Sequence, residues 1–231
     1  MEIRGAVVVV TGASSGIGAA TAKLAHARGA HVVMAARRSH RLQALAAELP
    51  GALAVPTDVT AAADLESLIT TAVEAQGRVD ILVNNAGQGL HVPLEEVELD
   101  ALRDVLALNL LAPLRAMQLV LPHMRRQGRG AIVNVSSGTT RMTLPGVGAY
   151  SATKAALNQL SATARAEWEP YGIVVSLVLP PVTATEFFDS LRQGIRDRSA
   201  LLARARPATA VAEAVLGAAE TGEAEVFVPQ H

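Results

Sequence analysis

Short apolar runs alternate with stretches of helical pattern along almost the whole chain. The first run, residues 6–10, reads Ala-Val-Val-Val-Val and is typical of a strand that is buried on both faces. A helical pattern follows over residues 17–28 and ends at Gly29. The same alternation predicts further strands at residues 31–36, 53–56, 79–84, 131–136, 173–179 and 225–228.

The remaining helices are predicted between these strands. They cover residues 39–49, 60–77, 94–110, 113–127, 149–168 and 208–221. Helices that connect successive strands indicate right-handed β-α-β crossovers and a parallel sheet covered on both faces. We therefore predict an α/β fold with a doubly wound parallel sheet, a Rossmann fold, in which residues 1–231 form a single domain. The length and the 50% hydrophobic content suit one large core.

Polar or glycine-rich clusters follow six of the predicted strands. They are residues 12–18, Arg37 with Arg38, Asp58, residues 84–87, Ser136 with Ser137, and residues 180–185. Ligands of such sheets bind outside the carboxyl ends of the strands, so these clusters are expected to share one site.

The first cluster, in TGASSGIG, predicts a dinucleotide site. Small residues let the backbone approach a pyrophosphate, and the helix N-terminus supplies amide donors and a favourable dipole. A tight turn without a ligand has the same local sequence. The predicted cofactor-binding residues here are Gly12, Ser14, Ser15, Gly16, Ile17 and Gly18.

Tyr150 and Lys154 are candidates for acid–base chemistry. They lie four residues apart in a predicted helix and so share one face. Hydride reduction of a carbonyl leaves an oxyanion that must be protonated, and a free tyrosine, with a pKa near ~10, is a weak acid for that step. A neighbouring ammonium is expected to lower that pKa. Ser137, at the end of a strand, offers a hydroxyl to the substrate oxygen.

The motifs TGASSGIG, TDVT, NNAG, NVSS and YSATK, together with Asn109, span nearly the whole chain. In order and spacing they resemble the compact, single-domain short-chain dehydrogenases/reductases. The resemblance implies that Tyr150 is the general acid or base and that Lys154 also holds the cofactor's ribose hydroxyls. It further implies that Asn109 positions a water which links Lys154 to solvent.

The resemblance also implies contacts along the cofactor. The residues concerned are Asp58 and Val59 at the adenine, Asn85, Ala86 and Gly87 along the adenosine ribose, Pro180 near the nicotinamide, and Thr183 and Thr185 at the carboxamide. The chain has Pro180-Pro181 where the family usually has Pro-Gly. Since proline fixes φ and lacks an amide donor, a different local path is expected there.

The end of the second strand bears on the choice of cofactor. Ala36 stands where enzymes for the unphosphorylated cofactor usually place an acid, and Arg37 and Arg38 follow it. Guanidinium groups form strong, charge-assisted hydrogen bonds with a 2′-phosphate. We predict a preference for NADP(H), with Arg37 as the main contact and Ser14 as a helper. NAD(H) remains possible, because a solvated basic helix start has the same sequence.

The sequence leaves the substrate open. The expected walls are residues 138–148, His91 and a lid over residues 185–206. Phe187, Phe188 and Leu191 suit an apolar substrate, whereas Arg192, Arg196 and Arg198 suit an acidic one or form a solvated helix face.

The predicted function is the interconversion of a carbonyl group, in a ketone or aldehyde, and a secondary or primary alcohol with NADP(H). The partner is a small-molecule substrate. The alternatives are an NAD-dependent alcohol dehydrogenase and a dinucleotide-binding sensor without turnover.

Composition excludes several other classes. The net charge of −1 gives no electrostatic reason for binding nucleic acid or an anionic membrane. Zero cysteines exclude disulfides and thiolate catalysis and are compatible with a cytoplasmic protein. No His, Asp and Glu cluster has metal-ligand spacing, so no metal is expected.

The pattern of apolar residues also bears on membranes and assembly. No apolar stretch is expected to approach the roughly 20 residues of a membrane span, and the first residues lead directly into a strand, which predicts no signal peptide. The family resemblance implies a homodimer or homotetramer, and the short end of the chain favours the dimer.

Overall fold

The structure, a computed structural model, describes residues 1–194 and 205–229. Its central sheet has seven strands, all parallel, in the order β11-β7-β6-β4-β1-β2-β3. The strands are β1 (Val7–Thr11), β2 (His31–Ala36), β3 (Leu53–Pro56), β4 (Ile81–Asn84), β6 (Gly130–Val135), β7 (Ile173–Leu179) and β11 (Glu225–Phe227). The predicted doubly wound parallel sheet is confirmed.

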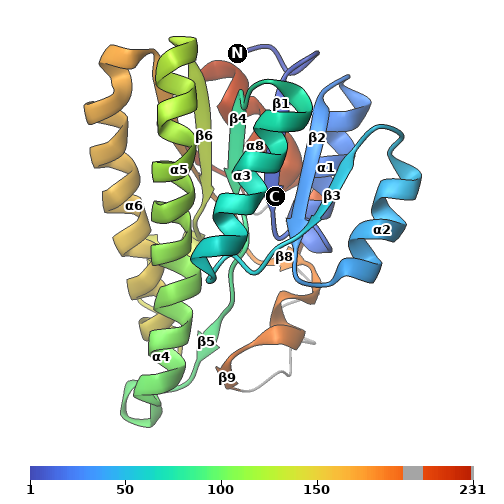
Figure 1. The fold of residues 1–231 in the computed structure, drawn as a ribbon. Coiled ribbons are helices and arrows are strands. Elements are labelled where there is room, and N and C mark those ends of the chain that lie inside the picture. The colour runs from blue at the N-terminus through green and yellow to red at the C-terminus, as the bar shows by residue number, and fades with distance from the viewer. Residues whose placement is uncertain (195–204, 230–231) are drawn as a thin grey trace.

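Helices cover both faces of this sheet (Figure 1). One layer contains α1 (Gly16–Ala27), α2 (Ser39–Glu48) and α8 (Ala208–Thr221), and the other contains α3 (Ala62–Gln76), α5 (Ala112–Gln127) and α6 (Gly148–Trp168). Within β1, Val8 and Val10 pack against the first layer, whereas Val7 and Val9 pack against the second. Because successive side chains of a strand point to opposite faces, a strand covered on both sides is apolar throughout.

The two helices predicted at residues 94–110 and 113–127 form one continuous helical rod, so the predicted break between them was wrong. After the short turn η1 (Leu94–Glu96), α4 (Leu99–Leu106) continues through a π-helical turn, η2 (Ala107–Leu111), into α5. In η2 the Ala112 amide donates to the carbonyl of Ala107, five residues earlier. The wider turn carries the helix past Pro113, which has no amide hydrogen to donate.

This rod also corrects the prediction about membrane-length segments. Residues Leu99–Gln127 make a helix of 29 residues whose most apolar window has a mean hydropathy of 1.5, so it is long and apolar enough to cross a membrane. Length and composition are weak grounds, because the core helix of a soluble protein passes the same test. Here Ala116, Met117, Val120 and Met124 are buried against the sheet.

The remaining elements are short and were not predicted. Two-residue strands pair β5 (Leu90–His91) with β9 (Gln193–Gly194) and β8 (Thr183–Ala184) with β10 (Arg206–Pro207). The β5–β9 pair joins the segment that follows β7 to the loop after β4, whereas the β8–β10 pair joins two parts of the segment between β7 and α8. The 3-10 turns are η3 (Gly138–Arg141), η4 (Glu169–Tyr171) and η5 (Glu186–Ser190). Arg196 and Arg198 lie outside the described residues.

Candidate active site

A cleft of about 850 Å³ runs along the carboxyl ends of the strands, and all six polar clusters contribute to its walls. Two of the predicted site residues, Gly18 and Asn109, do not line it. The predicted residues that do are Gly12, Ser14, Ser15, Gly16, Ile17, Arg37, Arg38, Asp58, Val59, Asn85, Ala86, Gly87, Ser137, Tyr150, Lys154, Pro180, Thr183 and Thr185.

The turn between β1 and α1 needs its glycines for two reasons. Gly12 and Gly16 have φ values of +67° and +54°, which side chains rarely adopt. A Cβ on Gly18 would lie 2.4 Å from the carbonyl oxygen of Gly12, so this glycine lets α1 pack tightly behind the turn. No side chain of the described residues caps α1, which leaves its first-turn amides for an anion. The turn therefore fits a pyrophosphate.

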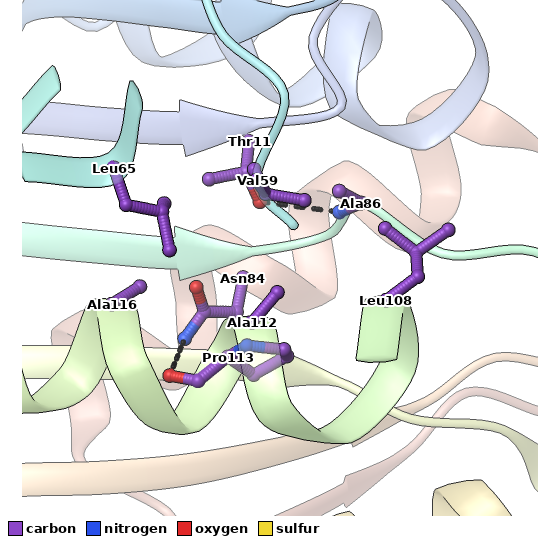
Figure 2. Close-up of a pocket in the computed structure, with 9 residues that line it drawn as sticks. All are labelled: Thr11, Val59, Leu65, Asn84, Ala86, Leu108, Ala112, Pro113 and Ala116. Carbon is purple, nitrogen blue, oxygen red and sulfur yellow. Dashed lines mark hydrogen bonds between the residues drawn. The ribbon is translucent and has the colours of Figure 1, made fainter. Parts of the chain in front are cut away.

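Thr11, at the end of β1, fixes the neighbouring NNAG loop. Its Oγ1 accepts hydrogen bonds from the amides of Asn85 (3.0 Å) and Ala86 (3.2 Å), and the Asn85 side chain donates to the carbonyl of Thr11 (2.9 Å). Figure 2 shows Thr11 and Ala86 above α5, with Asn84 donating to the carbonyl of Pro113. The space between these residues and α5 has no room for a ligand. These residues pack tightly against one another and support the wall of the cleft.

Tyr150 and Lys154 lie on α6 at the floor of the cleft and are both buried, with exposed fractions of 6% and 4%. The Lys154 Nζ donates to the carbonyl of Val135 at 2.9 Å. Ser137 follows β6 and its Oγ accepts from the amide (3.2 Å) and the hydroxyl (2.9 Å) of Thr139. The structure thus brings Ser137, Tyr150 and Lys154 together.

Burial dominates the acidity of this group. It raises the pKa of Tyr150 to about 12, although a hydrogen bond with Ser137 acts in the opposite direction. It also lowers the pKa of Lys154 to about 8. The sequence-based expectation was that the lysine lowers the tyrosine's pKa, and the structure differs because loss of solvent around the phenolate outweighs other effects. Tyr150 is therefore a neutral proton donor at pH 7.

Asn109 lies behind the cleft wall, fully buried in the π-helical turn. Its Oδ1 accepts from the Gln88 amide, and its Nδ2 donates to the Gln88 carbonyl, both at 3.0 Å. The Nδ2 also donates to the Thr153 hydroxyl at 3.1 Å. A Cβ on Gly87 would lie 3.2 Å from the Asn109 Oδ1 and 3.4 Å from the Lys154 Nζ. The role in positioning a water stays a prediction, and the visible contacts hold the Gln88 loop.

The adenosine end of the cleft centres on Arg38. Its guanidinium donates to the hydroxyls of Ser14 (2.9 and 3.1 Å) and Ser15 (2.6 Å), and its Nη1 pairs with Glu186 at 3.0 Å. Arg37 is exposed. Because Arg37 also lines the cleft, its role as the main contact stays a prediction, and Arg38 is a second candidate beside it.

Asp58 lies beside this end of the cleft and stays ionised. Its Oδ1 accepts from the amide (3.0 Å) and the hydroxyl (2.7 Å) of Thr60. Burial raises the pKa of Asp58, but these hydrogen bonds and the charge of Arg37 outweigh it, so the net pKa is lowered.

The substrate end is mainly aromatic. His91 lies between the rings of Tyr150 (5.6 Å between centroids) and Phe188 (5.7 Å), and Phe187 also contacts Tyr150 at 5.7 Å. Burial lowers the pKa of His91, so its imidazole is neutral at pH 7. Arg192 pairs with Asp104 at 2.6 Å and does not line the cleft. Among the described residues, the substrate wall therefore fits an apolar substrate and not an acidic one.

Described residues of the segment after β7 contribute to the walls of the cleft. Pro180 accepts a hydrogen bond from the Gly138 amide at 2.9 Å, and Pro181 accepts from the Thr183 hydroxyl at 2.8 Å. The Thr185 hydroxyl accepts from the Phe187 amide at 3.3 Å, and its methyl group packs over Gly16. The contacts of Thr183 and Thr185 with a carboxamide stay predictions.

Sequence reasoning missed several lining or supporting residues. The sequence could have identified Arg41, because it lies three residues after Arg38 at the start of a helix and therefore shares a helix face with it. Thr11, Glu186 and Phe227 carry no local signal. Their contacts join parts of the chain that only the fold brings together.

Comparisons with known proteins agree with this architecture. A family model described as short chain dehydrogenase matches residues 6–196. L-fucose dehydrogenase from Oryctolagus cuniculus is 36% identical over 229 residues, which are 97% of this chain and 78% of that protein.

Two solved structures are also similar. A short-chain dehydrogenase from Streptomyces avermitilis has a TM-score of 0.86 at 33% identity, covering 97% of this chain and 88% of that one. A 3-ketoacyl-(acyl-carrier-protein) reductase from Brucella melitensis, complexed with NADH, has a TM-score of 0.89 at 28% identity, covering 98% and 97%. With the cleft, the glycine turn and the Ser-Tyr-Lys group in place, the chain belongs to the short-chain dehydrogenase/reductase family of NAD(P)-dependent oxidoreductases that act on alcohol or carbonyl groups.

Proposed function

We propose that the protein is an NADP(H)-dependent reductase of ketones or aldehydes that carry an apolar body. The observation that carries the proposal is the buried Tyr150, which lines the cleft together with Ser137 and Lys154 and whose ring packs against His91 and Phe187. A group so placed donates a proton inside a site that an apolar substrate closes to water.

The residues divide the chemistry among them. A bound nicotinamide would supply the hydride that adds to the carbonyl carbon. Tyr150 gives its proton to the carbonyl oxygen, which becomes the alcohol, and Ser137 orients that oxygen through its hydroxyl. Lys154, with a pKa of about 8, is mostly an ammonium at pH 7, and its positive charge stabilises the phenolate left behind.

The preference for NADP(H) is supported by the adenosine end. Ala36 presents no carboxylate there, and Arg38 and Arg41 both line the cleft. Two guanidinium groups attract a 2′-phosphate and give no specific contact to the ribose hydroxyls of NAD(H).

The substrate preference is supported by the walls and the mouth of the cleft. Phe187 and Phe188 form a wall, while Met142, Leu144 and Phe227 line the mouth with exposed fractions of 53%, 43% and 52%. Large apolar side chains left in water at the rim of a pocket indicate a ligand that covers them.

An NAD-dependent alcohol dehydrogenase is the second candidate. It is favoured by the NADH bound to the Brucella melitensis reductase and by the similarity to an L-fucose dehydrogenase. The apolar walls oppose a sugar as substrate. The comparisons favour both enzymes over a sensor without turnover. By family likeness we propose a homo-oligomer, and a cytoplasmic location stays a prediction.

The decisive experiment follows the absorbance of NADPH and NADH with aryl ketones, aliphatic ketones, aldehydes and keto esters, and the reduction of NADP⁺ and NAD⁺ by L-fucose. We expect turnover with NADPH on ketones that have an aryl or alkyl body. Turnover of L-fucose with NAD⁺, and none with NADPH on the apolar carbonyls, would establish the second candidate.

A further inference from the structure

Glu186 is an acidic residue at the point where the proposed 2′-phosphate would bind. Its Oε2 accepts from the Arg38 Nη1 at 3.0 Å and from the Arg41 Nη1 at 2.6 Å. The residue lies 148 positions from Arg38 in the chain and reaches it across the cleft from η5. The two arginines are thus already bridged by one carboxylate.

The backbone on both sides of Glu186 is held in place. Thr185 packs over Gly16, where a Cβ would lie 2.9 Å from the threonine methyl group. Phe188, two residues later, is buried, and the adjacent Phe187 contacts the Tyr150 ring. The Glu186 side chain itself is 47% exposed. It can leave the arginines by rotating into solvent, without movement of η5.

The charge of the arginine cluster depends on this contact. Hydrogen bonds from Arg38 and Arg41 keep the pKa of Glu186 below its usual range, so the carboxylate is ionised at pH 7. With Glu186 in place, the cluster of three side chains carries one net positive charge instead of two. A phosphate that binds there must displace the carboxylate or accept a like charge beside it.

We propose that Glu186 is a specificity-determining residue, whose carboxylate competes with the 2′-phosphate of NADP(H) for Arg38 and Arg41. It makes the protein less selective for the phosphorylated cofactor than its arginines alone would be. The inference rests on the proposed preference for NADP(H).

The test uses two nucleotide fragments that differ only in the 2′-phosphate. Adenosine 2′,5′-bisphosphate and adenosine 5′-monophosphate are titrated by calorimetry into the wild type and E186Q. Unit charges a few ångströms apart near a protein surface interact strongly, so removing the Glu186 charge should change the affinity for the phosphate measurably. We expect E186Q to bind the bisphosphate about five- to tenfold more tightly than the wild type does. The affinity for the monophosphate should stay within about twofold, and the gain should shrink as salt is added.

E66Q is the matched control. Glu66 also pairs with an arginine, Arg115, its side chain is 53% exposed, and it does not line the cleft. Its replacement removes the same charge elsewhere on the surface, and both fragments should bind as they do to the wild type. E186A serves as a second variant and should change affinity in the same direction as E186Q.

The outcomes separate the two proposals. If the wild type prefers the bisphosphate but E186Q binds it no more tightly, the role of Glu186 is wrong and the proposed NADP(H) preference stands. Weaker binding of both fragments to E186Q would also overturn the inference, since Glu186 would then act as a brace for the cleft. If neither protein prefers the bisphosphate, both proposals fail.

Discussion

The two ends of the cleft are built in opposite ways. At the catalytic end, Tyr150 and Lys154 are almost completely buried, and the Lys154 Nζ is held by a backbone carbonyl. At the adenosine end, the side chains of Arg38, Arg41 and Glu186 are 40%, 39% and 47% exposed, and Glu186 forms ion pairs with both arginines.

The two ends differ in how far the pKa values of their groups are shifted and in how easily the contacts of those groups can be replaced. Burial at the catalytic end moves pKa values far from their solution range, because the surroundings cannot solvate charge. Contacts between exposed charges are weak and screened by salt, so partners at the other end can be exchanged at little cost. We infer that the reaction chemistry is fixed by the fold, whereas the choice of cofactor is open to single substitutions.

The largest effect is expected from Tyr150→Phe, which removes the buried hydroxyl and keeps the ring. Without the proton donor, kcat should fall by about 10²- to 10⁴-fold. The dissociation constant of NADPH, measured by fluorescence titration, should change little, because the ring contacts with His91 and Phe187 remain. A variant that keeps most of its turnover would mean that another group delivers the proton.

Lys154→Met tests whether burial really controls the catalytic end. Burial lowers the pKa of Lys154 to about 8 in the folded protein, against 10.5 for a lysine in water. Between these two values the unfolded chain binds the extra proton, so the stability of the wild type relative to K154M should rise with pH in this window. The total change is about 3 kcal/mol.

The measurement is denaturant unfolding of both proteins from pH 7 to pH 10.5. Taking the difference between them removes the titration of Tyr150 and of surface groups, which the two proteins share. Turnover should be strongly reduced in K154M at every pH. A stability difference that does not change with pH would show that the Lys154 pKa is close to that of a free lysine.

The contrast between the two ends also explains how far the sequence could predict the site. The spacing of Tyr150 and Lys154 places both on one face of a helix, and the alternation of apolar runs with helices places Ser137 at the same edge of the sheet. Such relations depend on backbone periodicity alone. The choice between Arg37 and Arg38 depends instead on the local path where β2 enters α2, and Glu186 reaches Arg38 only in the folded chain.

The π-helical turn around Asn109 was missed for a related reason. An apolar pattern that continues past Pro113 reads as two helices, because proline ordinarily ends one. The turn that accommodates this proline changes the hydrogen bonding of only a few residues and leaves no mark on the periodicity.

The smallest effect, and the sharpest comparison of adjacent residues, is expected at the adenosine end from Arg38→Ala and Arg37→Ala. A charge-assisted hydrogen bond contributes about 1.5–3 kcal/mol, but Arg38 must give up part of its contact with Glu186 to form one. We therefore expect R38A to weaken NADPH binding by about tenfold and R37A by about two- to threefold. Neither variant should change the affinity for NADH by more than about twofold, because NADH carries no 2′-phosphate for these groups to contact. The dissociation constants of NADPH and NADH are measured by fluorescence titration. If R37A weakens NADPH binding more than R38A does, Arg37 is the main contact.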